Sequence, residues 1–124
     1  MYFEVNGVKT YCSNGTGKLD SNQNSVVFIH GAGFDHTTFV LASRYFARNN
    51  FNVYAIDLPG HGNSAGDPLD SIKAMSDWVY SAFNELNIEK TALVGHSMGS
   101  LISLQFASDH PDSLRSMVLV GTSI

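Results

Sequence analysis

The sequence predicts an α/β fold in which a mostly parallel sheet carries helices on both faces. Short apolar runs of strand length alternate with longer segments in which apolar residues recur at helical spacing. The strand-like runs are continuously apolar, which is typical of strands buried on both faces of a parallel sheet. The 124 residues show no internal repeat, low-complexity tract or linker. We therefore expect a single domain over residues 1–124.

The first two expected strands, residues 2–5 and 8–12, form an antiparallel pair. Asn6 and Gly7 stand between them, and this pair supplies the two positive-φ residues of a type I′ turn. Residues 13–25 are rich in Gly, Asn and Ser without periodicity, which indicates a surface loop.

The alternation of buried strands with helices begins at residue 26. The expected elements are a strand at 26–29, a helix at 38–49, a strand at 53–56, a helix capped by Asp70 or Ser71, a strand at 91–94, a helix from about Met98 to Asp109, and a strand at 117–120. The helix after Ser71 has an apolar stripe in steps of three and four, made by Ile72, Met75, Val79, Phe83 and Leu86.

The segment Gly95-His96-Ser97-Met98-Gly99 joins the strand at 91–94 to the following helix. Gly-x-Ser-x-Gly on such flanks is typical of a nucleophile elbow, a sharp turn that exposes a serine. Glycines two residues before and after that serine let the helix pack closely on the strand. We therefore expect Ser97 to be a catalytic nucleophile, and an ordinary surface serine is the alternative.

A second match to the same pattern, residues 62–66, is centred on Ser64. It lies in a stretch rich in turn residues, with no strand leading directly in and no helix leading directly out. We therefore interpret Ser64 as a loop serine. The pattern alone is weak, and its flanks select Ser97.

Backbone N–H groups near Ser97 are expected to form an oxyanion hole. The N–H of Met98 opens the helix after the serine, where the helix dipole favours negative charge. A second donor should come from the loop after the strand at 26–29. Ala32 is the leading candidate in that loop and Gly33 the reserve, and a plain glycine-rich turn is the alternative.

Three ordered motifs, HGAGFDHTTF, DLPGHGNS and GHSMG, together resemble the N-terminal portion of the α/β-hydrolase fold family. The resemblance runs through essentially the whole chain. It implies the strand order 1-2-4-3-5-6, a fold truncated after the sixth strand, and a serine rather than an aspartate nucleophile. It also implies an esterase-like or lipase-like serine hydrolase for a carboxylic ester or related acyl substrate, with no cofactor.

The histidines of the chain do not supply an evident general base. The resemblance places the catalytic histidine after the eighth strand and the acid after the sixth or seventh, so we expect both outside these 124 residues. His30 and His96 are expected to orient backbone, and His110 lies at the far end of the third helix. His36 and His61, in loops at the carboxyl ends of strands, are candidates for the substrate pocket. We expect little or no hydrolysis from the 124 residues alone.

Composition excludes several classes of function. The formal net charge is −4 and Lys and Arg do not cluster, which argues against nucleic acid and anionic membranes as partners and favours a small-molecule acyl substrate. Histidine spacing predicts no metal site. Asp57 is expected to fix its own loop by accepting backbone hydrogen bonds. Cys12 is the only cysteine, and no run has signal-peptide or transmembrane character, so we expect a cytoplasmic protein.

A second hypothesis is a non-catalytic or partner-completed binding module that retains the serine turn. The strand at 117–120 would be an exposed apolar edge, which is a liability for a monomer. In this reading a partner chain covers that strand.

Overall fold

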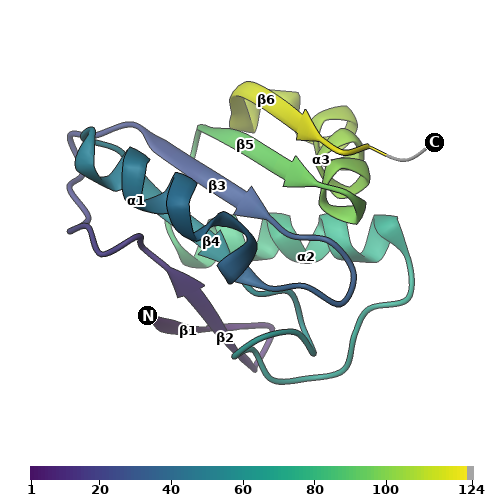
Figure 1. Cartoon of the computed structure of the whole chain (residues 1–124). Helices are drawn as coiled ribbons and strands as arrows, with labels where there is room; N and C mark the ends of the chain where they lie inside the picture. Colours follow the sequence, from purple (N-terminus) through teal and green to yellow (C-terminus); the bar gives the residue numbers. More distant parts are fainter. Residues whose placement is uncertain (123–124) are drawn as a thin grey trace.

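The computed structural model describes residues 1–122 as a six-stranded sheet flanked by helices (Figure 1). The strands are β1 (Tyr2–Val5), β2 (Val8–Ser13), β3 (Ser25–Ile29), β4 (Asn52–Ile56), β5 (Thr91–His96) and β6 (Leu114–Val120). The helices are the 3₁₀ helix η1 (His36–Phe39), α1 (Val40–Arg48), α2 (Ile72–Glu85), α3 (Met98–Asp109) and the 3₁₀ helix η2 (Pro111–Ser113).

The strand order β1-β2-β4-β3-β5-β6 confirms the order implied by the sequence resemblance. Strand β3 pairs in parallel with β4 and β5, and β5 pairs in parallel with β6. The pairs β1–β2 and β2–β4 are antiparallel, so the sheet is mostly parallel, as predicted. Asn6 and Gly7 have φ values of 51° and 78°, as a type I′ turn requires.

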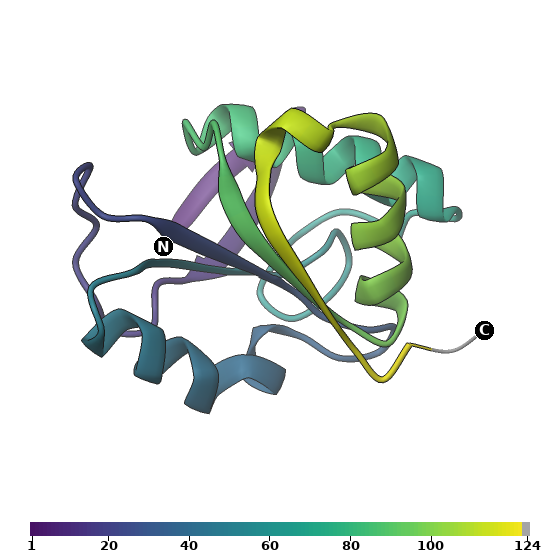
Figure 2. The same ribbon diagram turned by 90° about the horizontal axis from the view of Figure 1, so that it is seen from above.

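Helices cover both faces of the sheet, with α1 on one side and α2 and α3 on the other (Figure 2). Each face has its own core. Phe83 of α2 and Phe106 of α3 pack with Ile29 and Leu93 on one face, and Phe28 and Phe39 pack with α1 on the other. Each fully buried side chain of this size stabilises the fold by about 1.5–3 kcal/mol. The two cores fix the β3 and β5 ends that carry the candidate site.

Some element boundaries differ from the predicted ones for local reasons. The expected helix at 38–49 is two elements, because the Asp35 side chain accepts from Thr37 N at 2.9 Å and begins the short helix η1 two residues earlier. Strand β6 begins at Leu114, three residues before the expected start. Ser71, one of the two predicted caps, is the cap of α2 and accepts from Ala74 N at 3.0 Å.

The expected apolar edge at β6 is present. Within the part of the chain that the structure describes, β6 pairs only with β5. Val118, Leu119 and Val120 are 51%, 36% and 45% exposed. This strand therefore presents apolar side chains at the edge of the sheet.

Candidate active site

Ser97 occupies a tight turn between the end of β5 and the start of α3. Its φ of 56° and ψ of −118° lie in a region that residues with a Cβ rarely adopt. Holding such a residue there costs on the order of 1–3 kcal/mol, which the surrounding packing must offset. One contact that holds the turn is the hydrogen bond from Ser97 N to Val120 O, at 2.9 Å. The turn thus couples β5 to β6 and leaves Ser97 half-buried.

The two glycines that flank Ser97 are required for space. A Cβ on Gly95 would overlap the carbonyl of Gly99, and a Cβ on Gly99 would overlap the carbonyl of Ile29. The first turn of α3 therefore lies directly against the end of β3. This packing is the physical reason for glycine at both positions of the predicted motif.

The loop after β3 reaches the same turn. A Cβ built on Gly31 would lie 3.1 Å from Ser97 Cβ, so the start of this loop is in contact with the serine. The next two residues, Ala32 and Gly33, are exposed, and their N–H groups donate to no acceptor within residues 1–122. Met98 is the first residue of α3, where an N–H has no partner in its own helix. The structure thus brings Ser97 and the three expected N–H donors, Met98, Ala32 and Gly33, to one edge of the sheet.

His30 holds the beginning of this loop from inside the protein. Its ring is fully buried, with Nδ1 2.7 Å from Gly31 O, and its Nε2 accepts from Leu58 N at 3.1 Å. We assign the proton to Nδ1 because Nε2 is an acceptor. Burial lowers the pKa of His30 below its ordinary value, and the bond to Gly31 O opposes that shift. The ring therefore orients backbone, as the sequence predicted.

None of the histidines bonds to the serine hydroxyl. Among residues 1–122 no side chain forms a hydrogen bond with Ser97 Oγ. The His96 ring lies near Phe34 and Phe39, with a buried Nδ1 that has no partner in the described chain. The His110 ring stacks on Tyr80 at 3.7 Å, beyond the far end of α3.

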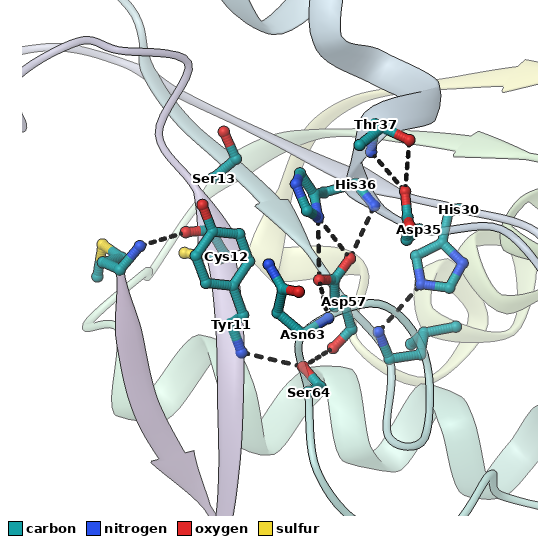
Figure 3. Close-up of polar contacts among 12 residues, drawn as sticks. Tyr11, Cys12, Ser13, His30, Asp35, His36, Thr37, Asp57, Asn63 and Ser64 are labelled. Atoms are coloured by element: carbon teal, nitrogen blue, oxygen red, sulfur yellow. Dashed lines mark hydrogen bonds and ion pairs between the residues drawn. The ribbon is translucent and has the colours of Figure 1, made fainter.

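The two histidines expected to face substrate have other contacts. His61 lies against the His30 ring at 5.1 Å, with Nδ1 3.0 Å from Pro59 O. The His36 ring is bonded through Nδ1 to the buried carboxylate of Asp57 and lies 4.9 Å from the Tyr11 ring (Figure 3). Contact of His36 and His61 with a substrate stays a prediction.

Phe34 is a site residue that the sequence did not single out. Its side chain is 55% exposed and lies beside Gly31, which in turn contacts Ser97. Its ring also meets the edge of His96 at 6.0 Å. The sequence could have indicated this residue, because Phe34 is the one large apolar residue between His30 and Asp35.

Ser64, the serine of the second Gly-x-Ser-x-Gly match, both donates and accepts a hydrogen bond through its hydroxyl. Its Oγ donates to Asp57 O at 2.7 Å and accepts from Tyr11 N at 2.9 Å. The hydroxyl thereby ties β2 to the loop after β4. This is a structural role in a loop, as predicted.

A cavity of about 450 Å³ lies elsewhere in the molecule. Its lining includes Ser25, Asn52 and Arg115, which stand at or near the amino ends of β3, β4 and β6. Reaction sites of open parallel sheets lie at the carboxyl ends of the strands, where Ser97 and Ala32 are found. We therefore place the candidate active site at Ser97 and not at this cavity.

Two further observations concern metals and membranes. Within residues 1–122, no three His, Cys, Asp or Glu side chains are grouped so that they could hold a metal ion. No helix in the same range has both the length and the apolar character needed to cross a bilayer.

The strand order and the helices on both faces of the sheet are those of a known family of folds. A family model described as "alpha/beta hydrolase fold" matches residues 24–124. The chain belongs to the α/β-hydrolase fold family.

Hydrolases and esterases are among the curated relatives. A "pimeloyl-[acyl-carrier protein] methyl ester esterase" of Chromobacterium violaceum is 36% identical over 79% of this chain and 37% of its own length. An "(E)-2-((N-methylformamido)methylene)succinate hydrolase" of Acinetobacter baylyi is 32% identical over 77% of this chain and 36% of its own length. A thermophilic esterase of Thermogutta terrifontis has a similar structure, with a TM-score of 0.86, 25% identity, and 99% of this chain matched to 46% of its own. The chain thus spans less than half the length of these relatives.

Proposed function

We propose that this chain carries the nucleophile and the oxyanion hole of a serine hydrolase that acts on carboxylic esters or related acyl compounds. The observation that carries the proposal is Ser97, held at φ 56° between β5 and α3, with N–H groups nearby that donate to no acceptor within residues 1–122. The esterases among the relatives support the acyl substrate class. A cytoplasmic location belongs to the proposal, supported by the free thiol of Cys12.

In the proposed reaction, Ser97 Oγ attacks the acyl carbonyl carbon and its proton passes to a general base. The carbonyl oxygen becomes an oxyanion that accepts hydrogen bonds from the N–H groups of Met98 and Ala32, with Gly33 as the reserve donor. The C–O bond then breaks, and the alcohol leaves with the proton returned by the base. Water repeats the sequence on the acyl-enzyme and releases the acid.

The general base and its acid partner are proposed to lie outside residues 1–122. Each of the five histidines in that range contacts other groups, and none bonds to Ser97 Oγ. Exposed Phe34, which lies beside Gly31 near Ser97, supports an apolar acyl or alkyl group on the substrate. Small neutral esters are therefore the first compounds to test.

The test is ester hydrolysis by the protein translated from the complete reading frame. We expect Ser97→Ala to lower kcat/KM for a short-chain aryl ester by at least about a thousandfold, because the nucleophile is lost. Ser113→Ala, in the short helix η2, is the matched control and should keep wild-type activity. Activity retained in Ser97→Ala would show that another group is the nucleophile.

The exposed edge of β6 supports a second candidate, a binding module that a partner chain completes. Three consecutive apolar residues of β6 are at least one-third exposed. Burying them against a partner chain would remove apolar surface from water and pair the free edge of the strand. A stable complex through β6, without ester hydrolysis, is the expected behaviour of such a module. A monomer by size-exclusion chromatography that hydrolyses esters through Ser97 would rule it out.

A further inference from the structure

The carboxylate of Asp57 has an unusually complete set of partners for a group with no exposed surface. Oδ1 accepts from His36 N at 2.7 Å, and Oδ2 accepts from Asn63 N at 2.9 Å. His36 Nδ1 lies 2.9 Å from both oxygens (Figure 3). Two separate loops, one after β3 and one after β4, therefore converge on one carboxylate.

The His36 ring lowers the free-energy cost of burying the Asp57 carboxylate, because it supplies a side-chain hydrogen bond. Within residues 1–122, no Lys or Arg pairs with Asp57, and the His36 ring is its side-chain hydrogen-bond partner. A buried carboxylate without hydrogen-bond donors would cost several kcal/mol. The ring N–H of His36 is the side-chain donor here, and the Tyr11 ring lies 4.9 Å from the His36 ring.

Asp57 itself is rigidly held. Gly62 has a φ of 51°, and a Cβ on it would overlap the Asp57 carboxylate, so the loop folds closely around this group. Ser64 Oγ donates to Asp57 O and accepts from Tyr11 N, which fixes the backbone of Asp57 against β2. The carboxylate is thus a fixed point from which other groups are positioned.

The loop that carries Ala32 and Gly33 is attached at both of its ends to the loop that follows β4. At the first end, His30 accepts from Leu58 N and contacts Gly31 O. At the second end, His36 is bonded through its N–H and its ring to Asp57. Between the two attachments, Phe34 N donates to Gly31 O at 3.2 Å, and the N–H groups of Ala32 and Gly33 have no acceptor within residues 1–122. We therefore expect the two attachments to set where the N–H groups of Ala32 and Gly33 point.

We propose that His36 and Asp57 are positioning residues that hold the loop of residues 31–35 so that its N–H groups meet the oxyanion. The inference rests on the proposed function and adds a role for two side chains that do not touch Ser97. It also gives His36 a role other than the substrate contact expected from the sequence.

The test uses two substitutions of His36 in the protein translated from the complete reading frame. His36→Leu removes the ring donor, and we expect kcat to fall about tenfold with KM unchanged, since a misplaced donor costs less than the hundredfold or more of a deleted one. His36→Asn places an N–H the same number of bonds from the backbone as Nδ1 and should restore most of kcat. His110→Asn, at the end of α3, is the matched control and should leave kcat unchanged.

A second measurement separates positioning from general loosening of the fold. A trifluoromethyl ketone forms a tetrahedral oxyanion on a serine, whereas the corresponding methyl carbinol does not react and only occupies the site. We expect His36→Leu to lower the affinity for the ketone by the same factor as it lowers kcat/KM, and to leave the affinity for the carbinol unchanged. The same pattern is expected of Asp57→Asn if that variant folds.

Two results would overturn the positioning role while Ser97→Ala remains inactive. One is equal loss of affinity for ketone and carbinol in His36→Leu, and the other is failure of His36→Asn to recover kcat. An active Ser97→Ala would instead reject the proposed function itself. The two failures are therefore distinguishable.

Discussion

Gly99, in the first turn of α3, lies against the carbonyl of Ile29 at the end of β3 so closely that a Cβ on Gly99 would overlap it. This contact joins the helix that follows Ser97 to the strand that leads into the Ala32 loop. It keeps the two sets of N–H donors at a fixed separation. The geometry of the candidate site is thus set by backbone packing as well as by side chains.

Gly99→Ala is expected to destabilise the protein by about 3 kcal/mol, at the upper end of the range for overpacking. The backbone of Ile29 cannot move without disturbing β3. Gly7→Ala is the matched control, because Gly7 has a φ of 78° but no atom within 4 Å of an added Cβ. It should cost about 1–2 kcal/mol, from backbone strain alone. Denaturant unfolding measures both, and an equal loss would contradict the packing argument.

Ser97→Gly is expected to raise the free energy of unfolding by up to about 1 kcal/mol while it removes activity. Glycine tolerates the positive φ of this position, and part of the gain is offset by its greater chain entropy. Ser97→Ala keeps a Cβ and should leave the unfolding temperature near that of wild type. Thermal unfolding compares the two, and a less stable glycine variant would contradict strain at this turn.

Stability is expected to fall as pH drops below about 6.5, because burial lowers the pKa of His30 in the folded state. The unfolded chain then binds a proton that the folded chain does not, so stability is complete above the unfolded pKa of His30 and is lost as pH falls toward its folded pKa. One such proton accounts for at most about 1.4 kcal/mol per pH unit. Denaturant unfolding at pH 7.5 and 5.5 measures the change, and His30→Gln should reduce it. If His30→Gln loses as much stability between pH 7.5 and 5.5 as the wild type, groups other than His30 cause the pH dependence.

The thiol of Cys12 is expected to be inert in the folded protein. Burial raises its pKa to about 12, and the side chain is fully buried. A chromogenic disulfide reagent at pH 8 should modify Cys12 slowly in the native protein and rapidly after unfolding in denaturant. Rapid reaction of the native protein would show that β2 opens readily.

Much of the fold could be predicted because its determinants are local. The Asn6–Gly7 turn, the Ser71 cap and the buried apolar runs are set by neighbouring residues, and each is present as expected. The strand order came from the motif resemblance. Boundaries such as the start of β6 were less accurate, since pairing with β5 extends that strand beyond its apolar run.

The candidate site could be predicted only in part. Ser97, Met98 and Ala32 stand in recognisable motifs, whereas the bond between His36 and Asp57 joins residues 21 positions apart. Likewise, Ser64 reaches Tyr11 across 53 positions. Such contacts depend on how the loops pack after the sheet has formed, and single-sequence patterns do not encode that packing.

The most direct test of Ser97 as the nucleophile is labelling with a fluorophosphonate ester, followed by mapping of the adduct by mass spectrometry. In the protein translated from the complete reading frame, we expect one adduct per chain, on Ser97. Residues 1–124 alone should react far more slowly, because none of their five histidines bonds to Ser97 Oγ. An adduct on Ser64 or elsewhere would contradict Ser97 as the nucleophile, and rapid stoichiometric labelling of residues 1–124 alone would contradict the placement of the base.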